Sequence, residues 1–183
     1  MKKDLDSMNS EELGKLFPVS IVEPDPVWPR LYKTEEKKIR EVLGNDIIIN
    51  IDHIGSTAIA DMPAKPTIDI LIQVTEDTAN DHLIESLEKI GYHYIPKPEN
   101  PPPHMMFVKG YTPGGIRGQT YHIHIRHKGI HDEIIFRDCL VSNPDVAMEY
   151  ARLKYRLAET YRNDRDGYTE AKTEFVKRII GNP

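Results

Sequence analysis

The chain has 183 residues, 39% of them hydrophobic, which is enough for one domain with a substantial core. Its net charge of -5 argues against a general nucleic-acid binder, and its single cysteine excludes an intramolecular disulfide. No apolar run could span a bilayer, and the polar start lacks the apolar segment of a secretory signal. We therefore expect a soluble, cytoplasmic protein.

The pattern of apolar residues predicts a polar N-terminal extension, residues 1–18, followed by one domain, residues 19–183. The longest early helix is expected from about Pro26 or Pro29 to Leu43, because proline is tolerated in the first turn of a helix. Before and after this helix, the first half of the chain is predicted to form a helix over 10–16, strands over 19–23, 47–54 and 67–74, and a helix over 78–90. The second half is predicted to form strands over 105–109 and 119–127 and helices starting near 132, 144 and 166.

The order of these elements indicates the fold class. Strand and helix units come first and helices come last, which is typical of an α+β domain with a mixed sheet, packed helices and a C-terminal helical segment. The proline-rich stretch 97–103 is predicted to be a surface loop, and Tyr111–Gly118 a hairpin connection.

A glycine-serine turn between the strands over 47–54 and 67–74 is the most informative local feature. Gly55 permits a close backbone approach, while Ser56 or Thr57 can cap a short helix after the turn. The free amides of a helix N-terminus favour an anion, and Lys65 adds a positive charge. The turn is therefore a candidate phosphate site; alternatively, it only caps a helix.

Asp69 is the one carboxylate in the strand over 67–74. Its neighbours Ile68 and Ile70 point to the opposite face, which we expect to be the core. A carboxylate near a phosphate turn can hold a divalent cation, as in metal-assisted nucleotidyl transfer. The alternative is a hydrogen-bonded polar residue without a functional role.

A pair of histidines marks the strand over 119–127. Alternation puts His122 and His124 on the face opposite the apolar residues, where both can bind one metal ion or contact phosphate oxygens. They are candidate ligands together with Asp69, provided that the two strands are neighbours; otherwise they are ordinary strand histidines. His53, just before the turn, is a further candidate.

The sequence resembles the GrpB family of the nucleotidyltransferase superfamily from Val19 onward. The resemblance rests on Trp28 and Glu35, on HIGSTAIADMPAKPTIDI and YHIHI, and on FRDCL, YARLKYRLA and DRDGYTEAKTEFV. It implies a nucleotidyltransferase-like fold in which the strands of Asp69 and of the paired histidines are adjacent.

The resemblance also implies a departure from active nucleotidyltransferases. Those enzymes carry two acids separated by one residue on the strand after the turn, and a third acid on a later strand. Here Thr67 and Leu71 flank Asp69, and His122 and His124 stand on the later strand. Two-metal catalysis needs the missing charge, so the sequence indicates either a one-metal site of altered preference or a binding site without transfer chemistry.

Basic residues of the helical tail match positions of the family's motifs. Lys154, Arg165 and Lys172 are interpreted as cations that line the rim of the site and neutralise phosphates. The alternative is that they form surface ion pairs with Asp138, Asp164 or Glu170. A covalent role for Ser56 or Thr57 is a further possibility, but no order of serine, histidine and acid is readable from the chain.

The leading functional hypothesis is metal-assisted binding or transfer of a nucleotide or another phosphorylated small molecule. The metal and catalytic candidates are Asp69, His122 and His124, and the divalent ion is Mg, Mn or Zn. The phosphate-binding candidates are Gly55, Ser56, Thr57, Lys65, Lys154, Arg165 and Lys172. The alternatives are a catalytically inactive ligand-binding or regulatory module and an Asp/His metal-dependent hydrolase.

Overall fold

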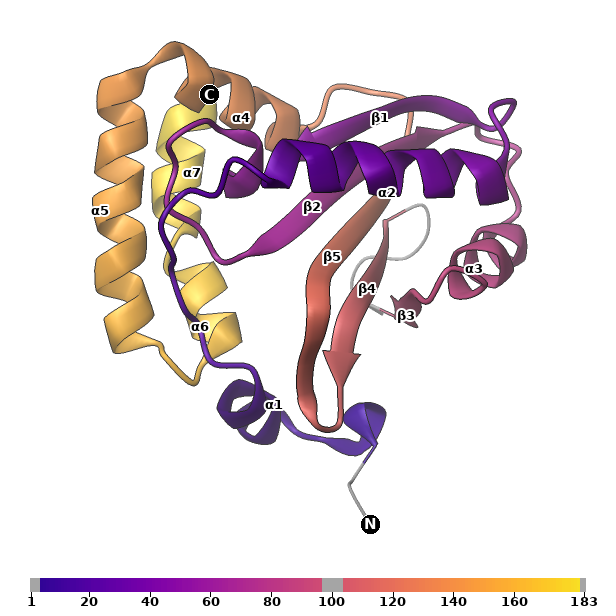
Figure 1. The fold of residues 1–183 in the computed structure, drawn as a ribbon. Helices are drawn as coiled ribbons and strands as arrows, with labels where there is room; N and C mark the ends of the chain where they lie inside the picture. The colour runs from indigo at the N-terminus through magenta and orange to yellow at the C-terminus, as the bar shows by residue number, and fades with distance from the viewer. Residues whose placement is uncertain (1–3, 97–103, 182–183) are drawn as a thin grey trace.

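A five-stranded mixed sheet is the centre of the fold in the computed structural model, which describes residues 4–96 and 104–181 (Figure 1). Its strand order is β1-β2-β5-β4-β3. The strands are β1 (Ile48–Ile54), β2 (Thr67–Val74), β3 (His93–Ile95), β4 (Met105–Thr112) and β5 (Gly115–His127). β2 and β5 run parallel, whereas the other pairings are antiparallel. The predicted α+β class with a mixed sheet is confirmed.

Helices cover one face of the sheet and its β1 side (Figure 1). The N-terminal part holds the 3-10 turn η1 (Leu5–Ser7), α1 (Ser10–Leu16), α2 (Trp28–Leu43), the 3-10 turn η2 (Ser56–Ala58) and α3 (Asn80–Glu88). The C-terminal segment holds α4 (Asp132–Ser142), α5 (Pro144–Thr160), α6 (Arg165–Glu170) and α7 (Thr173–Ile180). No helix of the described ranges combines the length and apolar character that crossing a bilayer requires.

Two hydrophobic clusters hold these layers together. The larger one lies between the sheet and helices α2 and α3, and it includes Tyr32, Ile39, Ile70 and Ile123. The smaller one joins the loop after η2 to α4, α5 and α7 around Tyr150. Burial of apolar surface contributes roughly 25 cal/mol per Å2 to the free energy of unfolding. Because one cluster packs on the sheet and the other on the loop after η2, the segments before and after the turn at Gly55 are both held by buried apolar contacts.

The predicted inward face of β2 is confirmed, because Ile68, Ile70 and Ile72 are each 0% exposed. The other face is also covered in part, since Leu71 is 0% and Gln73 6% exposed. β2 lies inside the sheet and is packed on both faces, and Asp69 is its one residue that is not fully buried.

The structure differs from the predicted elements in several places. The segment after Gly55 is one 3-10 turn and not a helix, and the strand expected over 19–23 is a single bridge between Val22 and Ala64. The last predicted helix is divided into α6 and α7, and β3 was missed. The expected hairpin loop is short, because β4 continues to Thr112 and β5 begins at Gly115. The predicted loop 97–103 lies outside the described residues.

Candidate functional site

Asp69 and His122 lie opposite each other on adjacent parallel strands, β2 and β5. The Oδ1 atom of Asp69 is 3.1 Å from the Nδ1 atom of His122. His124 is two residues further on the same face, and one ligand atom from each of the three residues lies within 4.8 Å of the others. The predicted clustering of Asp69, His122 and His124 is therefore confirmed.

Burial and charge control protonation in this cluster. Burial alone would raise the pKa of Asp69, but the hydrogen bond from His122 and the charges of His122, His124 and Lys65 outweigh it and lower this pKa. Burial lowers the pKa of His124 to about 4, against the opposing charge of Asp69. Asp69 is thus ionised and His124 neutral at pH 7, which are the states that bind metal ions.

Tyr111 on β4 is a member of the site that the sequence reasoning missed. Its hydroxyl lies 2.9 Å from Nε2 of His122, and the two rings stack with their centroids 5.7 Å apart. Tyr111 reaches this position after an irregularity in the β4–β5 register, where Gly110 has a φ of 92°. A glycine inside a strand pattern is typical of such a bulge, so Gly110 was the available signal.

The turn at Gly55 approaches the Asp69 carboxylate closely. Gly55 has a φ of 69°, and a Cβ atom at this position would lie 2.6 Å from Oδ2 of Asp69. Only glycine suits both the backbone conformation and the space. Because η2 is a single turn of three residues, the anion-favouring helix N-terminus that the sequence predicted is not formed here.

The sequence predicted that Lys154 on α5 lines the rim of the site, but the structure places it in the interior. It is 2% exposed, and its Nζ atom contacts Ser56 Oγ at 2.9 Å and the carbonyl oxygen of Pro63. The same nitrogen is 4.9 Å from the centroid of the Tyr150 ring. Burial, with the charge of Lys172, lowers the pKa of Lys154 to about 7. Lys154 therefore ties α5 to the turn from within the protein.

Lys65 and Lys172 both approach the ring of Tyr168, at 5.2 Å and 4.3 Å from its centroid. Burial and the charge of Arg165 lower the pKa of Lys65, while burial and the charge of Lys65 lower that of Lys172 to about 7. The charge of Asp69 opposes both shifts. Because these charges act at short range, the two lysines lie near each other and near Asp69.

Arg165 completes the group of cations. Its guanidinium lies 5.4 Å from the centroid of the Tyr111 ring and donates to the carbonyl oxygen of Phe17 at 3.2 Å. Within the described ranges, none of Lys154, Arg165 and Lys172 forms the alternative ion pairs with Asp138, Asp164 or Glu170. The cations beside Asp69 are thus left without carboxylate partners of that kind.

His53 is not part of the Asp69 cluster. It pairs with Ile70 in the β1–β2 ladder and stacks on Tyr32 of α2, with centroids 4.7 Å apart, so it faces the other side of the sheet. Its Nε2 atom is 3.0 Å from Oγ1 of Thr57, which in turn donates to the carbonyl oxygen of Thr67. Thr57 is 3% exposed, so its hydroxyl serves internal contacts rather than the open side of the turn.

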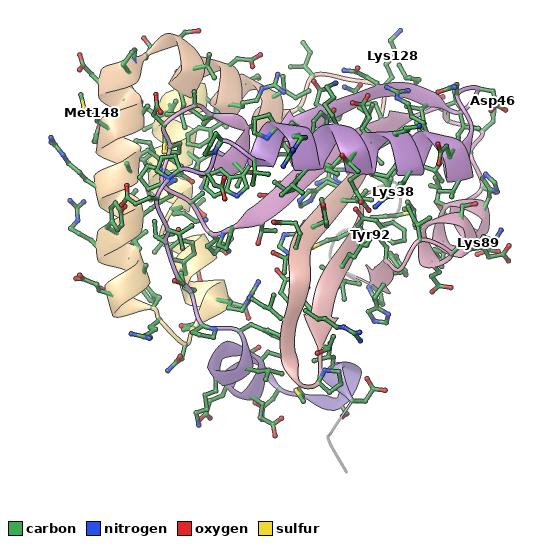
Figure 2. All side chains as sticks on the ribbon, viewed as in Figure 1. Lys38, Asp46, Lys89, Tyr92, Lys128 and Met148 are labelled. Carbon is green, nitrogen blue, oxygen red and sulfur yellow. The ribbon has the colours of Figure 1, made fainter. Side chains whose placement is uncertain are left out.

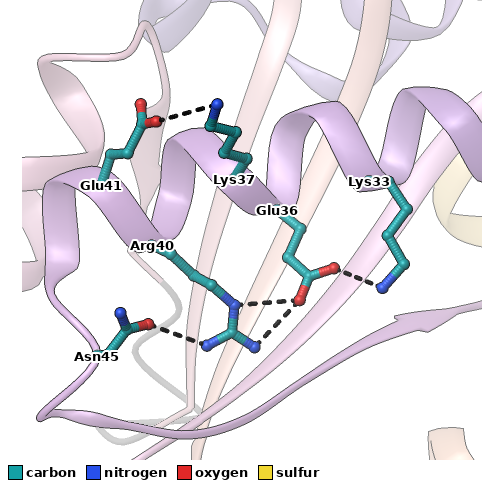
Figure 3. Close-up of a pocket in the computed structure, with 6 residues that line it drawn as sticks. All are labelled: Lys33, Glu36, Lys37, Arg40, Glu41 and Asn45. Carbon is teal, nitrogen blue, oxygen red and sulfur yellow. Dashed lines mark hydrogen bonds and ion pairs between the residues drawn. The ribbon is translucent and has the colours of Figure 1, made fainter.

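A surface hollow on α2 lies apart from this cluster. It has a volume of about 370 Å3 and is lined by charged side chains (Figure 3). Those side chains satisfy one another: Glu36 pairs with Lys33 and Arg40, and Glu41 pairs with Lys37 (Figure 3). Each charged side chain of the hollow already has a partner within it, although its three cations exceed its two carboxylates by one charge. Because these side chains are paired with one another, the hollow is a weaker candidate site than the Asp69 cluster.

The family model described as GrpB protein matches residues 18–182. The chain belongs to the GrpB family. It is 39% identical to the UPF0157 protein PA4798 of Pseudomonas aeruginosa over 89% of this chain, and it spans 66% of that protein's length. The crystal structure of the conserved protein GrpB from Enterococcus faecalis is similar, with a TM-score of 0.74 and 30% identity over 88% of this chain and 94% of that one.

A longer relative carries a functional name. The chain is 29% identical to a protein of Mycolicibacterium paratuberculosis named dephospho-CoA kinase, over 88% of this chain and 44% of that protein. This GrpB chain therefore corresponds to less than half of the named protein.

Proposed function

We propose that this GrpB protein uses a divalent metal ion to bind a nucleotide or another phosphorylated small molecule, with nucleotidyl transfer as the reaction class. The observation that carries the proposal is the cluster of Asp69, His122 and His124, whose ligand atoms lie within 4.8 Å of one another beside the turn at Gly55. Such a cluster, with cations next to it, suits the binding of a metal and of an anion together.

The donor set fits a transition metal better than magnesium. One carboxylate oxygen and two imidazole nitrogens suit Zn or Mn, whereas Mg prefers oxygen ligands. The neighbours of Asp69 on its face supply no second carboxylate, because Thr67 bonds to Thr120 and Leu71 is 0% exposed. When bound, the metal would supply charge neutralisation at a phosphoryl oxygen.

The protein's own groups hold Asp69 and His122 in place. With a proton on Nδ1, His122 donates to Asp69 and accepts at Nε2 from the Tyr111 hydroxyl. A metal ion at this place would replace the proton between Asp69 and His122. Tyr111 would then accept from Nε2–H, so that His122 keeps one orientation with or without the metal.

The phosphate end of the ligand is assigned to Lys65, Lys172 and Arg165. Lys65 and Lys172 have no carboxylate partner in the part of the chain that the structure describes, and burial makes two such amines unfavourable neighbours. An anionic group between them would relieve that cost. The dephospho-CoA kinase name of a longer relative supports a phosphorylated, nucleotide-like ligand as the class. Because the match spans 44% of that protein, the name does not assign kinase activity to this chain.

A metal titration of the stripped protein tests the proposal. Calorimetry and thermal melting are performed with Zn, Mn and Mg, alone and with ATP, UTP and coenzyme A precursors. Asp69→Asn and His122→Ala are compared with Asp77→Asn and His82→Ala, which change exposed residues away from the cluster. A ligand of the folded state raises the melting temperature in a concentration-dependent manner.

The expected result is binding of Zn or Mn with an affinity above that for Mg, lost in Asp69→Asn and His122→Ala but kept in the two controls. Nucleotides should stabilise the metal-loaded protein more than the stripped one. Equal metal binding by wild type and Asp69→Asn would overturn the metal site, and turnover assays on metal-loaded protein would then lose their basis.

The second candidate is an Asp/His metal-dependent hydrolase, favoured by the same donor set of one carboxylate and two histidines. It predicts release of phosphate or a nucleoside monophosphate from the substrate without an added acceptor. Nucleotidyl transfer predicts product only when an acceptor is present, so product analysis with and without an acceptor separates the two candidates.

A further inference from the structure

Ser56 and Lys154 form a close pair whose two members come from distant parts of the chain. The Oγ atom of Ser56 in η2 lies 2.9 Å from Nζ of Lys154 in α5. Ser56 is half-buried, whereas Lys154 is 2% exposed. A lysine so deeply buried is ordinarily paired with a carboxylate, yet within the described ranges the only polar partners of this amine are Ser56 and the carbonyl oxygen of Pro63.

The Nζ atom of Lys154 lies within donating distance of Ser56 Oγ and of the Pro63 carbonyl oxygen, and a neutral amine can keep both contacts. An uncharged amine has two N–H donors and one lone pair. One N–H can donate to the Pro63 carbonyl, and the lone pair can accept the hydroxyl proton of Ser56. Lys172 is the charged neighbour that disfavours protonation of Lys154, and Tyr150 from the same helix covers the amine.

Ser56 lies beside the candidate metal site. It follows Gly55, whose backbone passes beside the Asp69 carboxylate, so it stands next to the candidate metal ligands. Thr57 donates its hydroxyl proton to the Thr67 carbonyl inside the protein, whereas the described partners of the Ser56 hydroxyl are the Lys154 amine and the Tyr150 hydroxyl. Of these two partners, only the amine can act as a base.

We propose that Ser56 is a nucleophile toward phosphorus and that Lys154 is the general base that activates it. Lys154 Nζ takes the proton from Ser56 Oγ, the Oγ–P bond forms, and the bond from phosphorus to its leaving group breaks. The leaving group departs with the electron pair, and the lysine becomes an ammonium. Activation of serine by an adjacent lysine needs no histidine and no acid, which explains why no triad order is readable in the sequence.

The proposal rests on the proposed function for its substrate class, a phosphorylated small molecule, but its chemistry can be tested without metal or nucleotide. Diisopropyl fluorophosphate carries a phosphorus electrophile with fluoride as the leaving group. Reaction with this reagent in the presence of EDTA reports on the serine-lysine pair alone, whereas metal titration reports on Asp69 and the two histidines. The two proposals can therefore fail separately.

The experiment follows the rate of adduct formation on the full chain by intact mass and assigns the adduct by peptide mapping, between pH 5.5 and 9. We expect one adduct, on Ser56, with a rate that rises with pH around 7 as Lys154 becomes neutral. Lys154→Met should lower the rate about 100-fold, in line with loss of a general base. Lys154→Arg keeps the charge and serves as a second variant, because arginine cannot act as a base at these pH values.

Matched controls are Ser142→Ala and Lys177→Met, which alter exposed residues of α4 and α7. Both should be labelled as fast as wild type. Circular dichroism establishes that each variant is folded before its rate is compared. Absence of an adduct on Ser56 at pH 9, or equal rates in wild type and both Lys154 variants, would overturn the proposal and leave Lys154 as a structural tie between α5 and the turn.

Discussion

The Asp69 carboxylate and the His122 imidazole face each other across the only parallel pair in the described sheet, 3.1 Å apart. Parallel strands put residues in register side by side, so this contact follows from the pairing of β2 with β5. The metal candidates and the neighbouring turn at Gly55 are all arranged around it, and it gives the site several testable properties.

Tyr111→Phe should weaken metal binding without unfolding the protein. The substitution removes the hydroxyl that contacts Nε2 of His122 and keeps the stacked ring. Loss of a group that orients a metal ligand costs about 10-fold or more in affinity. Calorimetric titration with Zn checks this, and Tyr155→Phe, which removes an exposed hydroxyl bonded to Glu23, is the matched control. An unchanged affinity would show that Tyr111 does not orient His122.

Gly55→Ala should destabilise the fold and impair metal binding. The residue has a φ of 69°, and a methyl group there meets Oδ2 of Asp69, so we expect a cost of about 1–3 kcal/mol. Gly118→Ala is the control, because Gly118 has a φ of 72° with open space around it. Both variants introduce backbone strain, but only Gly55→Ala also introduces a clash with Asp69. Urea unfolding should therefore show a loss of stability in both variants, and metal titration a loss of affinity in Gly55→Ala alone.

Lys172→Met should weaken the binding of pyrophosphate to the metal-loaded protein by about 10-fold and leave metal affinity unchanged. The reason is the loss of one of two amines that lie over the Tyr168 ring and that have no carboxylate partner among the described residues. Lys177→Met, on the exposed side of α7, is the matched control. If both variants bind pyrophosphate as wild type does, the phosphate assignment of Lys172 is wrong.

Acid should destabilise the metal-free protein as pH falls from 6.5 to 4. Burial lowers the pKa of His53 to about 4 from an unfolded value of about 6.5. The unfolded chain therefore binds more protons between these pH values, and the free energy of unfolding falls as pH drops from 6.5 to 4. We expect His53 to contribute roughly 2 kcal/mol to this loss. Urea unfolding at pH 7 and 4.5 should show a smaller loss in His53→Gln than in wild type.

Glu35→Gln should cost far more stability than Glu41→Gln, although both lie on α2. Glu35 is 1% exposed, and its carboxylate lies 2.6 Å from Lys109 and 3.1 Å from Lys38, a lysine labelled in Figure 2. Because Glu35 is buried while Lys109 and Lys38 are partly exposed, we expect a cost of about 1.5–3 kcal/mol, as for hydrogen bonds to charged groups. The exposed pair of Glu41 with Lys37 should contribute less than about 0.5 kcal/mol (Figure 3). Similar unfolding free energies for the two variants would contradict this.

Periodicity was a good guide where one face of an element is buried. It predicted α2, β1, β2 and the β5 segment, and it put His122 and His124 on one face. It did not find β3, because three residues are too few to show a period, and it did not separate α6 from α7. The pattern after Gly55 predicts a helix where the structure has a 3-10 turn, because capping residues precede helices and 3-10 turns alike.

The site was predicted in part, and for identifiable reasons. Asp69, His122 and His124 could be grouped because strand alternation and the family resemblance both point to one surface. The position of Lys154 could not be predicted, since helical spacing fixes the face of a residue but not the depth at which that face is buried. Tyr111 was missed because a bulge at Gly110 alters the alternation on which the reasoning relied.

The sequence by itself determined the α+β class, the membership of the chain in a family and the chemical types present: one in-strand carboxylate, two alternating histidines and a glycine-serine turn. The tertiary structure decided the contacts that these groups make. The parallel pairing brought Asp69 to His122, and the packing of α5 brought Lys154 to Ser56 across 98 positions of the chain. Contacts of that kind depend on how whole layers pack, which no local pattern encodes.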